Sequence, residues 1–217
     1  MYPQSLWIAL FGYLVGSIPF SYLIPRWVKG IDIRKVGTGN VGGSNVARSV
    51  GVPYGILSGL LDISKAIVVV FLLRAWGFSL NEQVVGGIAA IVGHNWSVYL
   101  KFQGGRGISV TLGLFLVMIP KITLLSLIVV LIFTVLKENA LGVLLALVTA
   151  VLLAFFCPLC GGAPWAQGLT LSALGVVLLK RIYPFPQDLK AGRPFWPTLW
   201  NRLLFDTDVK KKLDLVV

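Results

Sequence analysis

Residues 52–73 read VPYGILSGLLDISKAIVVVFLL, and this stretch contains only two charged side chains, Asp62 and Lys65. A helix of this length extends about 33 Å at 1.5 Å per residue, which is enough to cross the roughly 30 Å hydrocarbon core of a bilayer. A helix also leaves no backbone hydrogen-bonding group bare in lipid, as an open strand would. The stretch therefore predicts a transmembrane helix.

The composition extends this prediction to the whole chain. Of its 217 residues, 57% are hydrophobic and only 12% are charged, against about 25% charged in ordinary soluble domains. These values exclude a disordered chain, a collagen-like chain and an ordinary cytosolic enzyme. The apolar segments predict an all-α integral membrane protein with seven transmembrane helices, at residues 5–25, 52–73, 84–100, 108–119, 122–136, 140–157 and 165–179.

The distribution of positive charge predicts the orientation of these helices. The first basic residue, Arg26, follows the first apolar segment, whereas a secretory signal peptide carries its basic residues before it. We therefore expect the N-terminus outside and the C-terminus in the cytoplasm. In that topology 16 of the 19 lysines and arginines face inward, in agreement with the positive-inside rule. The net charge of +11 then reflects orientation and contact with anionic lipid head groups, and no nucleic-acid partner is expected.

Two regions follow from this topology: a seven-helix membrane domain over residues 1–180, and a basic cytoplasmic tail over residues 181–217. Five apolar residues of the tail are spaced as on one face of a helix. They predict a short amphipathic helix that lies at the membrane surface. These residues are Trp196, Leu199, Trp200, Leu203 and Leu204.

A glycine-rich polar segment follows the first predicted span on the inner side. It contains Gly37, Thr38, Gly39, Asn40, Gly42, Ser44, Asn45 and Arg48. Glycine-rich backbone can direct several N–H groups toward one anion, and an arginine adds a two-pronged donor that fits phosphate. The spacing G-x-G-x-x-G occurs here, but no strand precedes it, which excludes the dinucleotide-binding fold. The alternative is a tight loop whose glycines serve helix packing.

A second motif, residues 93–107, ends in Gly104-Gly105-Arg106-Gly107 just before the short apolar segment 108–119. A helix that begins there offers free N–H groups and the positive end of its dipole to an anion. Because 12 helical residues span only about 18 Å, we expect this loop to dip into the membrane. Two such loops on one side predict a binding site for an anionic ligand, phosphate first of all. The alternative is two separate packing loops.

Three smaller features suggest structural roles. His94 is the only histidine, and with two cysteines it cannot build a standard zinc site, so no metal is expected. Asp62 and Lys65 lie on one face of their helix and are expected to form a structural ion pair. Cys157 and Cys160 form a C-x-x-C motif, for which two separate apolar cysteines is the favoured interpretation and a disulfide or redox pair the alternative.

The segment V-G-T-G-N-V-G-G-S-N-V-A-R (residues 36–48) and the later G-H…F-x-G-G-R-G (residues 93–107) together resemble the bacterial acyl-phosphate:glycerol-3-phosphate acyltransferases, the PlsY family. The resemblance extends over about residues 10–115. It implies a seven-helix enzyme of the bacterial inner membrane with its active site on the cytoplasmic side. Such an enzyme transfers a fatty acyl group from acyl phosphate to the 1-hydroxyl of glycerol 3-phosphate, which gives lysophosphatidic acid, and it uses no cofactor.

The resemblance also assigns roles to the polar residues. Gly37–Gly42 would form a phosphate-binding loop with Thr38 as a hydroxyl in the pocket, and Asn40, Ser44, Asn45 and Arg48 would bind glycerol 3-phosphate or support that loop. Gly104–Gly107, with Arg106, would hold the acyl phosphate or the developing oxyanion, and His94 would support this second motif. Thr38, Arg48 and Arg106 are the predicted catalytic residues. The expected partners are the two substrates and membrane lipids, and the oligomeric state stays open, with a monomer as one option.

The sequence departs from the family pattern at four places. The proline usual after Gly93-His94 is missing, with Ser97 near that place. Thr38 replaces the usual serine, and Arg106 replaces the usual lysine. The third family motif, an R-H-R-x-N-I run after the last helix, is not intact, since Lys180-Arg181-Ile182-Tyr183-Pro184 stands there. An altered or inactive paralogue that binds or transports an anion or a phospholipid head group is therefore an alternative function. Another acyl or phosphoryl transfer in the same pocket is a third.

Overall fold

The computed structural model describes residues 3–205, and all secondary structure in this part of the chain is helical. The elements are α1 (Pro3–Ser17), α2 (Phe20–Lys29), η1 (Ile33–Lys35), α3 (Gly43–Ser49), α4 (Val52–Ala75), α5 (Leu80–Asn95), η2 (Val98–Leu100), α6 (Ile108–Met118), α7 (Pro120–Val135), α8 (Asn139–Phe156), η3 (Pro158–Cys160), α9 (Pro164–Ile182), α10 (Phe185–Lys190), α11 (Phe195–Trp200) and the π-helical turn η4 (Asn201–Phe205). The predicted all-α class is therefore confirmed for the described residues.

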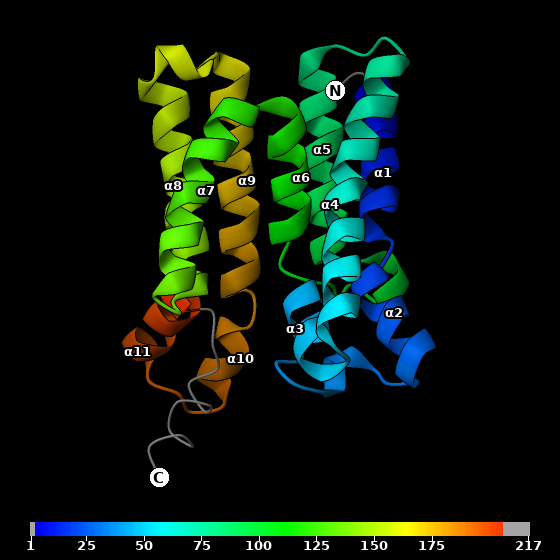
Figure 1. Cartoon of the computed structure of the whole chain (residues 1–217), viewed down its shortest axis with the longest axis vertical. Coiled ribbons are helices and arrows are strands. Elements are labelled where there is room, and N and C mark those ends of the chain that lie inside the picture. Colours follow the sequence, from blue (N-terminus) through cyan, green and yellow to red (C-terminus); the bar gives the residue numbers. More distant parts are fainter. Residues whose placement is uncertain (1–2, 206–217) are drawn as a thin grey trace.

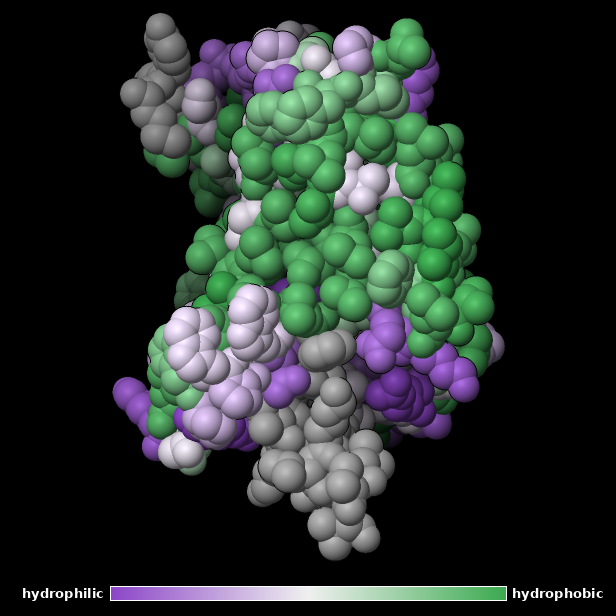
Figure 2. Space-filling model, turned by 90° about the vertical axis from the view of Figure 1, so that its left-hand side faces the viewer, coloured by the Kyte–Doolittle hydropathy of each residue, from purple (hydrophilic) through white to green (hydrophobic). Residues whose placement is uncertain are grey.

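The long helices run side by side along the long axis of the molecule (Figure 1). Four stretches of the described chain are long and apolar enough to cross a membrane: Gln4–Lys29, Val52–Ala75, Asn139–Phe156 and Pro164–Lys190. The first combines α1 with α2, and the last combines α9 with α10. The helices α6 and α7 are also apolar but shorter. Figure 2 shows the corresponding surface, a broad hydrophobic belt between two hydrophilic ends. This distribution is that of a multi-pass membrane protein.

Small residues set the closest contacts between helices. On α1, a Cβ atom at Gly12 or Gly16 would collide with backbone atoms of Gly86 and Ala90 on α5. Two pairs of small residues, each spaced by four, thus let the two backbones touch, as is common in membrane helices. A similar approach joins Gly113 of α6 to the backbone of α4. The larger apolar core lies between α4, α5, α6, α8 and α9.

Two predicted spans differ from the helices in the structure. The span 5–25 is not one helix, because α1 ends at Ser17 and α2 begins at Phe20. Pro19 stands in the break, where it lacks an N–H and restricts the residue before it. The span 84–100 is a helix only as far as Asn95, after which the chain turns. The second interruption lies within the second glycine-rich motif, whereas the first lies before α2, ahead of the first glycine-rich loop.

The interhelical segments divide between the two ends of the molecule. The helices α2, α3, α10 and α11 gather at one end, and the connection between α8 and α9 lies at the other (Figure 1). That connection holds the C-x-x-C motif. The favoured interpretation of two separate cysteines is wrong, since Cys157 and Cys160 form a disulfide with their Cα atoms 5.3 Å apart. The one-turn η3 helix brings the two sulfur atoms together.

The C-terminal segment is helical where a helix was predicted. The α11 helix and η4 turn cover Phe195–Phe205, with Trp196 and Trp200 exposed. Asp188 of α10 anchors the segment, accepting hydrogen bonds from Arg193 at 2.6 Å and from Arg202 at 2.8 and 3.1 Å. The rest of the predicted tail, residues 206–217, lies outside the described residues.

Candidate functional site

The first glycine-rich loop is organised around one buried amide, that of Asn45. Its Nδ2 lies 3.0–3.1 Å from the carbonyl oxygens of Ile33, Val36 and Asn40, so its two N–H donors are shared among three acceptors. Its Oδ1 accepts from the backbone N–H of Thr38 at 3.0 Å. The donors and the acceptor of this amide are therefore occupied by groups of the loop itself. Of the two predicted roles for Asn45, substrate binding and loop support, the geometry displays the second.

Two glycines let the loop turn around this amide. Gly37 and Gly39 have φ values of +59° and +72°, in the left-handed region that favours glycine. At Gly37 a Cβ atom would also collide with the Asn45 amide. Gly42 has an extended backbone that any residue can adopt. The first two glycines therefore serve the shape of the loop directly.

Three predicted ligand side chains lie on the outside of this loop. Thr38 is exposed, and its Oγ1 accepts a long hydrogen bond of 3.4 Å from the N–H of Asn40. Ser44 and Arg48 are exposed on α3. The loop and the start of α3 thus expose hydroxyls and a guanidinium, while the Asn45 amide stays buried.

A carboxylate–guanidinium pair closes the base of the loop. Arg34 donates from Nε and Nη2 to the two oxygens of Asp32 at 2.9 and 2.7 Å, and its guanidinium lies 5.0 Å from the Tyr22 ring centroid. The hydrogen bonds from Arg34 lower the pKa of Asp32 to about 2. The pair is therefore fully ionised near neutral pH.

The second loop folds onto the end of α5. Gly105 donates its N–H to the carbonyl of His94 at 3.0 Å. A Cβ atom at Gly104 would collide with that same carbonyl, so the loop lies flat on the helix end. Gly107, with φ of +77°, then turns the chain into α6. The first N–H groups of α6 have no partner within the helix and carry the positive end of its dipole.

The two loops meet. A Cβ atom at Gly105 would collide with the carbonyl of Val41 in the first loop and with Nε2 of His94. Arg34 also reaches across to Oε1 of Gln103 at 3.5 Å. Arg106, the predicted catalytic cation of the second loop, is half-buried beside this contact. The two motifs were predicted to lie on one side of the protein, and these contacts place them together.

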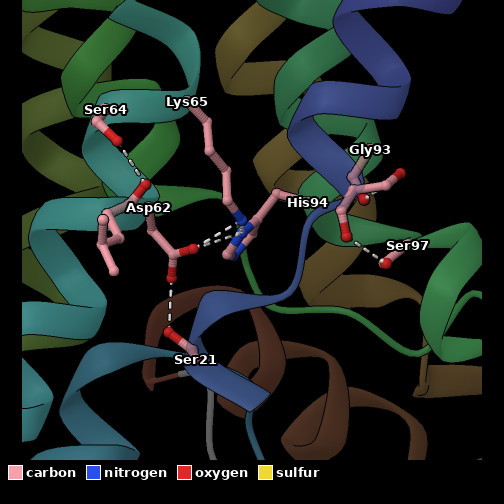
Figure 3. A network of polar contacts seen from close by, with 9 residues as sticks. Ser21, Asp62, Ser64, Lys65, Gly93, His94 and Ser97 are labelled. Atoms are coloured by element: carbon pink, nitrogen blue, oxygen red, sulfur yellow. Dashed lines mark hydrogen bonds and ion pairs between the residues drawn. The ribbon is translucent and has the colours of Figure 1, made fainter. Parts of the chain in front are cut away.

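A buried polar network that includes His94 lies next to this junction (Figure 3). Lys65 forms an ion pair with Asp62 at 2.7 Å, which confirms the predicted pairing, and its Nζ lies 3.3 Å from Nδ1 of His94. The other Asp62 oxygen accepts from Ser21 of α2 at 2.6 Å. All four side chains are buried. Buried charges are stable only when paired in this way, so the network fixes the imidazole on which Gly105 rests.

Two further hydrogen bonds connect the break after α1 to the second glycine-rich motif. Ser17 donates its hydroxyl to the carbonyl of Gly93 at 3.2 Å, and its own carbonyl accepts from Ser97 at 2.6 Å. A small pocket of about 10 Å³ lies between these groups and the glycines of the second loop. Neither these hydrogen bonds nor the Ser21 contact was foreseen, because all of them join residues at least 41 positions apart.

The site has no metal-binding set in the described part of the chain, where no three His, Cys, Asp or Glu side chains gather. Its donors are backbone N–H groups, hydroxyls, amides, lysine and arginine. Such groups bind anions. The fold and these loops together define a class: a multi-pass helical membrane protein with two adjoining glycine-rich basic loops at one end.

Comparison with known proteins gives the family. A family model described as glycerol-3-phosphate acyltransferase matches residues 6–187. "Glycerol-3-phosphate acyltransferase 5" of Dehalococcoides mccartyi is 36% identical over 208 residues, covering 94% of this chain and 89% of the relative. The "Glycerol-3-phosphate acyltransferase" of Myxococcus xanthus is 42% identical over 146 residues, covering 66% of this chain and 76% of the relative. The chain belongs to the glycerol-3-phosphate acyltransferase family.

Two solved structures share the fold. The crystal structure of PlsY, an integral membrane glycerol 3-phosphate acyltransferase, in its glycerol 3-phosphate form has a TM-score of 0.74 at 29% identity, covering 88% of this chain and 94% of that chain. The lysophosphatidic acid form has a TM-score of 0.72 at 27% identity, covering 91% and 99%. The family resemblance inferred from the two loop motifs is thus confirmed.

Proposed function

We propose that this protein transfers a fatty acyl group from acyl phosphate to the 1-hydroxyl of glycerol 3-phosphate. The products are lysophosphatidic acid and inorganic phosphate. One observation carries the proposal: the two glycine-rich basic loops meet, with Val41 of the first against Gly105 of the second. A reaction between two phosphate-bearing substrates needs two adjacent anion sites. The names of the family relatives and the ligand forms of the related structures support the same substrates.

The loops divide the work of binding. The first loop, with Thr38, Ser44 and Arg48 exposed on it, holds glycerol 3-phosphate. The second loop, with Arg106 and the N–H groups at the start of α6, holds the acyl phosphate. Holding the hydroxyl and the acyl carbon together removes most of the entropic barrier of a two-substrate reaction. The donors of the second loop stabilise charge as it develops on the reacting group.

The acyl phosphate is already activated, so the chemistry makes few demands on ionisable side chains. The 1-hydroxyl oxygen attacks the acyl carbon, and the bond from that carbon to the phosphate oxygen breaks. Phosphate leaves with the bonding electron pair. A phosphate whose second pKa is near 6 accepts the hydroxyl proton. This route needs neither a metal nor a side-chain base.

A groove beside the second loop suits the fatty chain. It has a volume of about 120 Å³ and begins at Ile108, directly after Gly107. From there it follows α6 to Phe115, between α7 and α8, and its lining is largely apolar. A chain attached to a phosphate on the second loop would enter this groove without crossing a polar region.

We also propose the topology and location that the charge pattern predicts: seven spans in the bacterial inner membrane, the N-terminus outside, and both loops facing the cytoplasm. The disulfide supports this orientation. Cys157–Cys160 lies at the end opposite α2 and α3 (Figure 1), and disulfides persist in the periplasm but rarely in the cytoplasm. Residues 181–217 then form the cytoplasmic tail, whose exposed Trp196 and Trp200 suit the membrane interface.

Substitution of the two arginines tests the site assignment. Purified protein is supplied with acyl phosphate and labelled glycerol 3-phosphate, and lysophosphatidic acid is measured. Arg48→Ala and Arg106→Ala are each expected to lose most of the activity. If both variants keep wild-type rates, the assignment is wrong. Glycerol 3-phosphate flux into proteoliposomes without acyl transfer would favour the alternative of a transporter.

A further inference from the structure

The last turn of α9 directs a lysine toward the second loop. Lys180 donates from Nζ to the carbonyl of Asn95 at 2.6 Å, although the two residues are 85 positions apart. The ammonium also lies 5.2 Å from the ring centroid of Trp96 and 5.4 Å from that of Tyr183. Such contacts with aromatic faces hold a cation in place. Lys180 is therefore fixed against the floor of the site, and it does not extend freely into the head-group region.

The next residue, Arg181, has a structural role. Arg181 is 1% exposed and donates to the carbonyls of Leu203 at 2.6 Å and Ala140 at 2.9 Å. It thereby ties the C-terminal segment to the start of α8. Consecutive residues on a helix point about 100° apart, so only Lys180 faces the second loop. The two basic residues at this place do not share one function.

The surroundings of Lys180 are short of negative charge. Within residues 3–205 it forms no ion pair with a carboxylate. The cation Arg106 directly precedes Gly107, which packs against the side chain of the same Asn95 that Lys180 contacts. One of its three N–H donors is used by Asn95, and two remain. Asn95 itself is fully buried beneath Gly107. Two neighbouring cations at the edge of a glycine-rich loop create a place where an anion is strongly stabilised.

We propose that Lys180 is a phosphate-binding residue of the second loop, which with Arg106 holds the phosphate of the acyl donor. The inference rests on the proposed function. It also gives a physical reason for the missing third motif, because α9 supplies a cation to the site from the position where that motif is not intact. As the acyl–oxygen bond breaks, the charge of the leaving phosphate grows. The ammonium then binds it more strongly than it bound the substrate.

Three substitutions separate charge from structure. Lys180→Arg keeps the charge, Lys180→Gln keeps a donor but loses the charge, and Lys180→Met loses both. The matched control is Lys190→Gln, an exposed lysine at the end of α10. For each variant we would measure the KM for acyl phosphate, the KM for glycerol 3-phosphate, inhibition by inorganic phosphate, and thermal stability in detergent.

We expect the Gln and Met variants to raise both the KM for acyl phosphate and the inhibition constant of inorganic phosphate by about 10- to 100-fold, the usual effect of losing a charge-assisted hydrogen bond. The KM for glycerol 3-phosphate should change far less. Lys180→Arg and Lys190→Gln should stay close to wild type. The inference is overturned if Lys180→Gln matches Lys190→Gln, or if both KM values rise together with a loss of stability.

A measurement on the unmodified protein covers the case in which a variant does not fold. Wild-type protein is acetylated with acetic anhydride, with and without inorganic phosphate, and peptides are compared by mass spectrometry. Phosphate should lower the acetylation of Lys180 and leave that of Lys190 unchanged. If phosphate changes the acetylation of Lys180 no more than that of Lys190, the inference is refuted. The result is independent of turnover. If the wild type transferred no acyl group, the proposed function would be wrong, while protection of Lys180 would still show that it binds phosphate.

Discussion

Replacing Gly105 by alanine tests the contact on which the site depends. An added Cβ atom would lie closer than 3.0 Å to the carbonyl of Val41 and to Nε2 of His94. Neither neighbour can move easily. Val41 is backbone of the first loop, and His94 is held by the ion pair between Asp62 and Lys65. The methyl group must therefore push the two loops apart.

The size of the effect follows from the geometry. Inserting one methyl group into a closely packed site costs about 1–3 kcal/mol of stability. The cost in activity should be larger, because a displacement of about 1 Å between bound reactants lowers the rate about 100-fold. We expect Gly105→Ala to remain folded and to lose about 100-fold in kcat/KM for lysophosphatidic acid formation. Initial rates and thermal melts in detergent would measure both quantities.

Gly168→Ala is the matched control for this experiment. Gly168 lies on the exposed side of α9, and a Cβ atom there would meet nothing within 4 Å. Alanine in a helix is about 0.5–1 kcal/mol more favourable than glycine, so this variant should be fully active and slightly more stable. Wild-type kcat/KM in Gly105→Ala would refute the reasoning that the two loops act through their mutual contact.

Three further predictions concern the groups that support the site. Asn45→Ala removes the amide that binds three loop carbonyls and one loop N–H, so melts should show a loss of about 2 kcal/mol and assays a raised KM for glycerol 3-phosphate; an unchanged KM would contradict the loop's assignment. Asp62→Asn leaves Lys65 buried without a counter-charge and should lower the free energy of unfolding by about 3–5 kcal/mol. The double variant Asp62→Asn, Lys65→Met should lose less stability. Denaturation curves that show the double variant to be less stable than Asp62→Asn would contradict this. The pKa of Asp32 is lowered to about 2 by Arg34, so the stability that this pair contributes should be complete above about pH 4 and be lost as pH falls toward 2. Melts of wild type and Asp32→Asn from pH 7 to pH 2.5 would test it, and a difference already gone at pH 5 would count against the pair.

Much of the fold could be predicted because the membrane imposes a simple pattern. Apolar length predicted α4, α6, α8 and α9 to within a few residues. The break in the first span was not predicted, because a proline alone does not show where a helix breaks: α2 contains Pro25 and stays helical. What distinguishes Pro19 is tertiary: the carbonyl of Ser17, freed at the break, accepts a hydrogen bond from Ser97. No local pattern contains that partner.

The candidate site likewise has features that the sequence predicts and features that it does not. Its two loops were visible as clusters of glycine and basic residues, since anion binding needs flexible backbone and positive charge close together in sequence. The contacts that hold the loops were not visible. His94 meets Lys65 across 29 positions, and Asp62 meets Ser21 across 41. The pairing of Asp62 with Lys65 was predictable because residues three apart share a helix face.

The most direct test of the central claim is the stoichiometry of the reaction in a purified system. Protein in lipid nanodiscs would receive acyl phosphate and labelled glycerol 3-phosphate, with no acyl-CoA, acyl carrier protein or added metal, and both products would be quantified. The account predicts one lysophosphatidic acid for each phosphate released, and almost none of either with Arg106→Ala. Phosphate release without lysophosphatidic acid, or equal rates in the variant, would contradict it.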